Sequence, residues 1–219
     1  PSKPKSCVLE LMPMEIGVRS GSAISGLILV LFLLVHLAGL VPALVATEQF
    51  EHYASALHHS SWLALIELGL AATAVAHILL TLIKTIRNRR AGNAAALRSR
   101  RNQPLAAFAS GNKVLAGVIT LGFLALHLQQ LRWPRPADGL ELNQLSSVLQ
   151  QPINLAIYAL GSVAIGLHLL HGAEAAHRSL GWLTPANGQM LRLGGRLLAA
   201  LISAGFLMIS LGVALGGAA

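Results

Sequence analysis

The chain has 219 residues, of which 54% are hydrophobic and only 11% charged, and its mean hydropathy is +0.64. A soluble domain carries about 25% charged residues, so this composition argues against a soluble enzyme. The formal charge is +8, but no polar module is visible that would present it to a nucleic acid. The single cysteine, Cys7, excludes a disulfide framework, an iron–sulfur cluster of the chain's own and a Cys-x-x-Cys-His haem attachment site.

Five stretches are long and apolar enough to cross a membrane. A helix needs about 20 apolar residues to span a hydrocarbon core of about 30 Å. In chain order the expected spans are 21–45, 62–83, 108–131, 153–176 and 193–216. No domain boundary or low-complexity segment separates them, so we expect one all-α transmembrane domain, a five-helix bundle over residues 1–219.

The segments between the spans alternate in charge. Fourteen of the 16 Lys and Arg residues fall on one side of the membrane, and two, Arg132 and Arg135, on the other. The positive-inside rule then places the N-terminus in the cytoplasm and the C-terminus outside. This basic face could also hold anionic lipid or an acidic partner, although topology alone explains its charge. We expect little further function from the polar loop 88–103.

The first four spans contain a weak internal repeat. Residues 32–37 (FLLVHL) resemble residues 123–128 (FLALHL). In each half a second histidine follows 41 residues later, His77 after His36 and His168 after His127. The simplest description is two similar helical hairpins, followed by a fifth helix without histidine.

Histidine is expensive inside a membrane and is a functional candidate there. If the spans alternate in direction, His36 and His127 lie in the outer half of the membrane, and His77 and His168 in the inner half. At 1.5 Å per residue the two levels are about 10 Å apart. Two histidines at one depth on different helices suit a bis-histidine haem, because each neutral imidazole gives one nitrogen to the iron. A single such histidine is readily explained by hydrogen bonding between helices, but one in each of four spans favours two b-type haems.

Small residues near these histidines leave room for a flat macrocycle, although such residues also serve ordinary helix packing. They are Ala38, Gly39, Gly122, Ala125, Gly161 and Gly166. A metal transporter fits less well, because four ligands around one ion converge at one level. Transported cations usually also need buried carboxylates, and only Glu67 lies well inside a span.

Four segments of the chain carry a family resemblance. They are 25–39 (SGLILVLFLLVHLAG), 50–58 (FEHYASALH), 76–78 (AHI) with the basic run after it, and 168–182, which contains HLLHG and SLGW. These resemble the first helix, an outer loop, the second helix and the fourth helix of the single-chain di-haem cytochrome b subunit of bacterial succinate dehydrogenases and fumarate reductases. The resemblance covers most of residues 17–182, and no short motif in it is decisive alone.

The resemblance implies four haem ligands. His77 and His168 would hold a proximal haem on the cytoplasmic side, and His36 and His127 a distal haem, the same pairing that depth suggests. His171 is nearly one turn from His168. The resemblance places the ligand at His168 and leaves His171 to bond a propionate or a backbone carbonyl. The start of the first span departs from the family, because it has an arginine but no histidine.

The resemblance also implies partners and a reaction. A flavoprotein subunit and an iron–sulfur subunit would dock on the cytoplasmic face and exchange electrons with succinate or fumarate. The chain would carry these electrons through two haem b groups to or from a quinone, menaquinone or a related one. It has no dinucleotide-binding fingerprint and no soluble domain, so it would be the quinone-reactive part of the enzyme and not its dicarboxylate site.

A quinone site needs groups that donate hydrogen bonds and exchange protons. On the outer side the candidates are Glu67 and His58, with His52 and His59 nearby. An interfacial position explains Glu67 equally well, and a place in the loop explains His58 and His59 better than a role in the site. On the inner side, the candidates to meet haem propionates or a quinone carbonyl are Arg19, Ser22, Lys113 and Arg178. Positive-inside anchoring explains the basic ones equally well.

Two rival functions stay open from the sequence. A b-type cytochrome subunit of a hydrogenase, formate dehydrogenase or nitrate reductase would share the haem and quinone roles, although one histidine in each of four spans argues against it. A haem-free transporter would be colourless.

Overall fold

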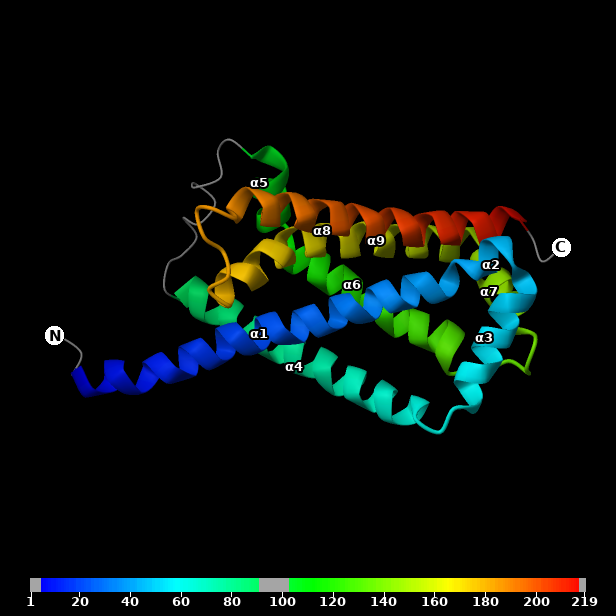
Figure 1. The fold of residues 1–219 in the computed structure, drawn as a ribbon, viewed down its shortest axis with the longest axis horizontal. Coiled ribbons are helices and arrows are strands. Elements are labelled where there is room, and N and C mark those ends of the chain that lie inside the picture. The colour runs from blue at the N-terminus through cyan, green and yellow to red at the C-terminus, as the bar shows by residue number, and fades with distance from the viewer. Residues whose placement is uncertain (1–4, 91–102, 217–219) are drawn as a thin grey trace.

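The computed structural model describes residues 5–90 and 103–216, with side chains from residue 15 onward. The described residues are mostly helical and contain no strand (Figure 1). Within it, five helical segments are long and apolar enough to cross a membrane: Glu15–Val45, Leu63–Arg90, Lys113–Arg132, Pro152–Ser179 and Gly188–Gly216. The prediction of five spans is confirmed. Most of the basic loop expected at 88–103 lies outside the described residues.

Several helix ends differ from the expected spans. Helix α1 (Lys5–Leu40) begins well before residue 21, and α4 (Leu63–Arg90) continues past residue 83 into the basic segment. Lys and Arg are good helix formers, so a charged end can extend a spanning helix beyond its apolar part. The last two helices, α8 (Pro152–Ser179) and α9 (Gly188–Gly216), are single and continuous.

The third expected span is divided. Helix α5 (Pro104–Gly111) ends at Asn112, whose φ of −98° and ψ of 8° leave the helical region, and α6 (Lys113–His127) begins directly after it. A π-helical turn, η2 (Leu128–Arg132), continues α6. The span therefore begins at Lys113 and not at residue 108.

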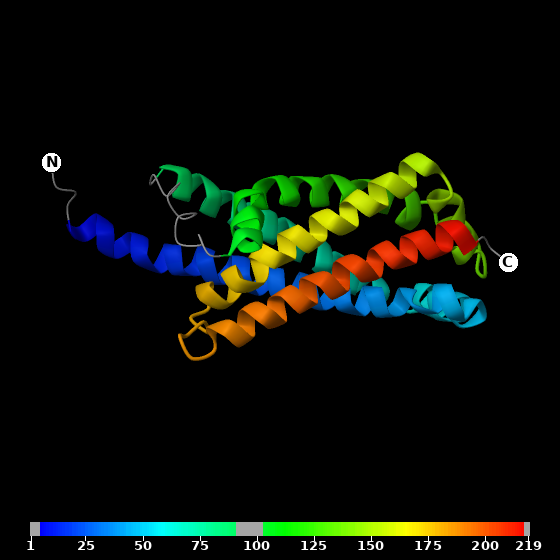
Figure 2. The same ribbon diagram turned by 90° about the horizontal axis from the view of Figure 1, so that it is seen from above.

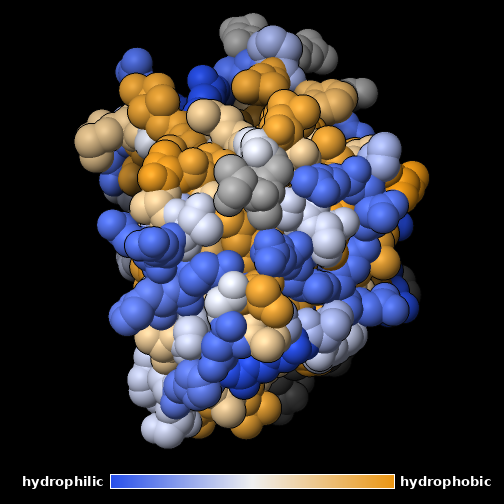
Figure 3. Space-filling view, turned by 90° about the vertical axis from the view of Figure 1, so that its right-hand side faces the viewer, coloured by the Kyte–Doolittle hydropathy of each residue, from blue (hydrophilic) through white to orange (hydrophobic). Residues whose placement is uncertain are grey.

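Short helices close one end of the bundle. They are α2 (Pro42–Val45) and α3 (Thr47–His59), which follow α1, and α7 (Glu141–Leu149), which precedes α8. We call this end, defined by α3 and α7, the capped end. Figure 3 views it directly, and hydrophilic side chains gather across it. The opposite end, where Arg19, Lys84, Lys113 and Arg178 lie near one another, is the basic end.

The internal repeat corresponds to two similar units. Each unit has a spanning helix, a short helix at the capped end and a returning helix: α1, α3 and α4 in the first, α6, α7 and α8 in the second. Helix α4 packs along α1 and α6 along α8, while α1 contacts α8 and joins the units. Helix α9 lies along α8 (Figure 2). Equivalent positions in the two units are 91 residues apart, as His36 and His127 are.

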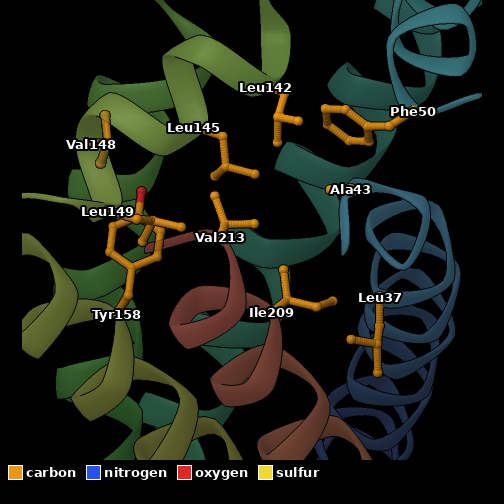
Figure 4. Packing of buried hydrophobic residues seen from close by; sticks show 10 residues of the cluster. All are labelled: Leu37, Ala43, Phe50, Leu142, Leu145, Val148, Leu149, Tyr158, Ile209 and Val213. Atoms are coloured by element: carbon orange, nitrogen blue, oxygen red, sulfur yellow. The ribbon is translucent and has the colours of Figure 1, made fainter. Parts of the chain in front are cut away.

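The core follows α8 and α9. One cluster at the capped end includes Leu149, Tyr158 and Ile209 (Figure 4). A second cluster consists of Ile165, Leu169, Ala199 and Ile202. None of the residues of α4 is buried, so this helix turns a wide apolar surface outward, as expected of a helix that faces lipid.

Candidate functional site

The structure brings the four membrane-level histidines together in two pairs. The ring centroids of His36 in α1 and His127 in α6 are 5.9 Å apart with an interplanar angle of 81°. Those of His77 in α4 and His168 in α8 are 6.2 Å apart at 79°. Each pair connects one unit to the other, and its two members are equivalent in the repeat. The ring opposite His77 is that of His168, although His171 follows within one turn.

The two pairs lie at different levels, which two glycines define. A Cβ added at Gly26 of α1 would lie 3.1 Å from Cε1 of His77, and one at Gly117 of α6 would lie 3.4 Å from Cε1 of His168. In both helices the histidine of the other pair follows this glycine by ten residues, or about 15 Å of helix. This distance along the helix is longer than the roughly 10 Å expected from the sequence. The expected value was obtained by counting residues from the ends of the expected spans, and several of those ends lie elsewhere in the structure.

Two imidazoles at this spacing can hold one metal ion between them. A metal–imidazole bond is about 2 Å long and the bonded nitrogen lies about 1 Å from the ring centre, so ligands on opposite sides of one metal have centroids about 6 Å apart. Both pairs have this separation. In residues 5–90 and 103–216 no three or more His, Cys, Asp or Glu side chains gather as a metal site. Each pair brings two imidazoles together, an arrangement that suits a metal whose remaining ligands come from a macrocycle.

The second ring nitrogens of these histidines differ in their partners. Nδ1 of His77 lies 3.2 Å from Oγ of Ser25. Nδ1 of His127 and of His168 is buried and makes no hydrogen bond to a described atom. A buried polar atom without a partner costs about 1–3 kcal/mol. The carbonyl oxygen of Lys113 lies near the ring of His168, so His127 is the one of these two whose nitrogen a bound group or its water would satisfy.

Aromatic rings surround the His36–His127 pair. Phe32 stacks on His36, with centroids 5.4 Å apart, while Phe123 and Tyr158 lie 5.7 and 5.9 Å from His127. Tyr158 is only 5% exposed, and its hydroxyl makes no hydrogen bond within the described structure. The sequence analysis did not single out Tyr158, although a lone tyrosine inside an apolar span was the available signal.

Three of the six small residues near the histidines face residues of other helices and not the histidine rings. A Cβ at Gly161 would lie 2.5 Å from the ring of Phe123, and one at Gly166 would lie 2.7 Å from Oγ of Ser203. At Gly39 it would lie 2.9 Å from the ring of Tyr53. These three glycines allow close packing, which was the alternative interpretation.

Positive charge gathers at the basic end, beside the His77–His168 pair. Arg19, Lys113 and Arg178 are close enough to Lys84 to act on its charge, and Lys84 donates a hydrogen bond of 3.3 Å to Oγ of Ser179. Such a cluster attracts an acidic group or ligand. Ser22 behaves differently: its side chain is buried and donates to the carbonyl oxygen of Arg19 at 2.9 Å, within its own helix.

Glu67 and His58, the candidates for proton exchange, lie at the capped end in different contacts. Glu67 receives two hydrogen bonds from Arg132, at 2.6 Å from Nε and 2.8 Å from Nη2. Nδ1 of His58 lies 3.5 Å from Oε1 of Glu141. Of the two histidines nearby, His59 bonds Asp138 at 2.8 Å and His52 is exposed.

Two carboxyl groups join α3 to α7. Glu51 accepts the backbone N–H groups of Glu141 at 3.1 Å and of Leu142 at 2.9 Å, which start α7, and Glu141 is buried at 8% exposure. Burial, together with a hydrogen bond to Glu141, raises the pKa of Glu51. Burial opposes ionisation of Glu141 as well, but its hydrogen bonds to Glu51 and to the backbone N–H of Gly139 outweigh this and lower its pKa. A proton shared by the pair therefore resides on Glu51.

Comparison with known proteins identifies no relative of this chain. No family model, no curated protein and no solved structure matches the chain. The function must therefore be argued from the chain's own residues, above all from the two histidine pairs.

Proposed function

We propose that the chain is a membrane cytochrome that binds two b-type haems, one between His36 and His127 and one between His77 and His168. The observation that carries this proposal is the ring separation of 5.9 and 6.2 Å in two pairs at separate levels. A haem held by the two imidazoles of a pair would supply one-electron chemistry, because both histidines would be engaged as its ligands and none would be left to exchange with a substrate. With one cysteine in the sequence, the haems would be held without covalent attachment.

The chain's own residues provide the surroundings that such a role needs. Phe32 and Phe123 cover the His36–His127 level with apolar rings and keep water from it. At the His77–His168 level, the cations of the basic end lie within reach of acid groups on a macrocycle. Arg19 and Lys113 are the proposed propionate contacts. The hydroxyl of Ser22 is already bonded to its own helix, so its contribution would come from its backbone.

The same proposal extends to the complex in which the chain works. We infer an anchor subunit of a succinate dehydrogenase or fumarate reductase, on the resemblance of segments 25–39, 50–58 and 168–182 to that family's cytochrome. The basic end would face the cytoplasm of a bacterium, following the positive-inside rule. There it would receive an iron–sulfur subunit with its flavoprotein. Electrons would pass between that end and a quinone.

The quinone is proposed to react at the capped end. Glu67 accepts two hydrogen bonds from Arg132, and the further lone pairs of its carboxyl oxygens would accept a hydrogen bond or a proton from a quinol. His58, beside the buried Glu141, would exchange protons with the surface. Both residues lie on the side of the His36–His127 pair, which is the pair nearer this end.

The first test is a pyridine haemochrome assay with a protein determination on the purified chain, produced with adequate haem. We expect two b-type haems per chain. His36→Ala and His127→Ala should each leave the same single haem, and His77→Ala and His168→Ala the other. The exposed His52 gives the control, since His52→Ala should keep both. A colourless wild-type chain would overturn the proposal and favour a transporter.

A second measurement tests the complex. The chain is produced with a tag in its native membrane, and haem reduction is followed after addition of succinate, formate or hydrogen. Reduction by succinate, with a flavoprotein in the purified complex, is the expected result. Reduction by hydrogen or formate alone would instead assign the cytochrome to another membrane dehydrogenase.

A further inference from the structure

A buried hydroxyl in α1 lies against the ring of His77. Ser25 is 7% exposed, and its Oγ is 3.2 Å from Nδ1 of His77 in α4. The same oxygen lies 2.7 Å from the carbonyl oxygen of Gly21 and 3.3 Å from that of Ser22, in the preceding turn of its own helix. Ser25 therefore connects the backbone of α1 to a histidine of α4.

The direction of these hydrogen bonds follows from their chemistry. A hydroxyl has one proton, and a carbonyl oxygen can only accept, so the short contact with Gly21 takes the proton of Ser25. Toward His77 the serine oxygen is then the acceptor, and Nδ1 of His77 carries hydrogen. The carbonyl oxygen of Ser22 also lies near this ring. The unprotonated nitrogen of His77 is therefore Nε2.

The second unit lacks this hydroxyl. The position equivalent to Ser25 is Ala116, which is buried at 3% exposure. The other surroundings match: Gly117 lies against His168 as Gly26 does against His77, and the carbonyl oxygen of Lys113 lies near His168, as that of Ser22 lies near His77. The two histidines of this pair thus differ by one hydroxyl in otherwise similar environments.

We propose that Ser25 is a positioning residue that fixes His77 as the Nδ1–H tautomer and makes its Nε2 a stronger donor to a bound metal than the ligating nitrogen of His168 would be. This inference rests on the proposed haem between His77 and His168. A hydrogen bond from the remote nitrogen of a ligating histidine fixes the ring orientation and makes the ligand more basic. A more basic ligand favours ferric iron, so Ser25 would lower the reduction potential of this haem and slow its loss.

The test compares serine variants of the full-length chain. Ser25→Ala removes the acceptor, Ser25→Thr keeps it, and Ser25→Ala combined with Ala116→Ser moves it to the His168 side. Ser210→Ala is the matched control, because Ser210 is also buried and bonds the carbonyl one turn back, at Phe206. The readouts are the reduction potential and electron paramagnetic resonance signal of the haem that His77→Ala removes. The third readout is the rate at which that haem transfers to an excess of a haem-scavenging protein.

Ser25→Ala should raise this potential and speed haem transfer about tenfold, as loss of a partner to a ligating histidine does. Ser25→Thr and the double variant should restore both values, and Ser210→Ala should change neither. Equal potentials in wild type and Ser25→Ala, with two haems in each, would overturn this inference and leave the proposed function intact. Loss of the haem in Ser25→Thr as well as Ser25→Ala would show a packing role and overturn it too. A wild-type chain without haem would overturn both proposals.

Discussion

Glu67 of α4 and Arg132 of η2 form a two-point ion pair at the capped end, with Nε 2.6 Å from Oε1 and Nη2 2.8 Å from Oε2. The two residues are 65 positions apart in the sequence. Because α4 packs mainly along α1, this pair gives it a direct connection to the second unit. The same carboxylate is the leading candidate for proton exchange with a quinone, so its structural and chemical roles have to be separated.

Glu67→Gln and Arg132→Gln should each lower the thermal stability of the purified chain. Both side chains are more than a third exposed, so the coupling is expected to be about 1 kcal/mol, or about 2–4 °C in Tm for a chain of this size. The loss of thermal stability in the double variant should be smaller than the sum of the losses in the two single variants. Glu48 is an exposed glutamate of α3, so Glu48→Gln should leave Tm unchanged. Additive losses would mean that the pair contributes no coupling.

Quinone turnover separates the two roles of Glu67. Both substitutions break the ion pair, but only Glu67→Gln removes a proton acceptor, and such groups contribute about 100-fold or more to rate. Glu67→Gln should therefore slow quinol oxidation far more than Arg132→Gln, with haem content unchanged in both. Equal rates in the two variants would confine Glu67 to a structural role.

His171 is predicted to be dispensable for haem binding. The ring that meets His77 belongs to His168, so His171→Ala should keep two haems per chain and His168→Ala only one. Pyridine haemochrome assays of both variants make the measurement, with equal protein recovery as the control on folding. The opposite result would move the axial ligand to His171.

The glycines that face the His77–His168 pair should tolerate a methyl group poorly, and unequally. An added Cβ lies 3.1 Å from the ring of His77 at Gly26, but 3.4 Å from that of His168 at Gly117. A contact as short as that at Gly26 costs about 1–3 kcal/mol when the neighbouring ring cannot move, whereas the distance at Gly117 is close to ordinary van der Waals contact. Gly26→Ala should therefore weaken retention of this haem more than Gly117→Ala.

Gly69 of α4 provides the control for these substitutions. No heavy atom lies within 4 Å of a Cβ added there, and alanine is the better helix former by about 1 kcal/mol. Gly69→Ala should keep both haems and stabilise the chain slightly. If all three alanine variants release haem alike, the ring contacts of the two glycines have no part in binding.

Much of this arrangement follows from local sequence signals. Hydropathy predicts five spans, because a span needs only length and apolarity, and the repeat of FLLVHL at 32–37 and FLALHL at 123–128 places histidines of the two units at equal depth. The structure then brings those residues together. The break at Asn112 was not predicted, although the sequence at 110–113 (SGNK) is locally polar, because hydropathy averaged over a whole span does not detect so short a polar segment or a local change of backbone angle.

Contacts between distant segments could not be predicted in the same way. Arg132 follows the third span and suggests an interfacial anchor, and nothing local indicates that it meets Glu67. From the sequence, Gly161 and Gly166 could equally make space for a macrocycle or allow a neighbouring helix to pack closely. The positions of Phe123 and Ser203 in the structure favour close packing. Helices α3 and α7 were missed because they are too short and too polar to cross a membrane.

The carboxyl pair of Glu51 and Glu141 should make stability depend on pH in a defined direction. The folded chain raises the pKa of Glu51, chiefly by burial, so it binds this proton more tightly than the unfolded chain. That contribution is complete below the ordinary value of 4.5 and is lost as pH rises through the higher folded value. Glu141 has a lowered pKa, so its contribution is present above 4.5 and is lost as pH falls through the folded value.

Thermal unfolding of wild type and Glu51→Gln across pH 4 to 8 tests this directly, with pH values chosen about the ordinary range of carboxyl groups. Glutamine can still accept a backbone N–H of α7 and donate to Glu141, but it does not titrate. The difference in Tm between variant and wild type should therefore grow as pH rises, while charges elsewhere, including His58 beside Glu141, cancel in the comparison. Glu48→Gln should follow wild type at every pH. Parallel curves for wild type and Glu51→Gln would show that no proton is held between α3 and α7.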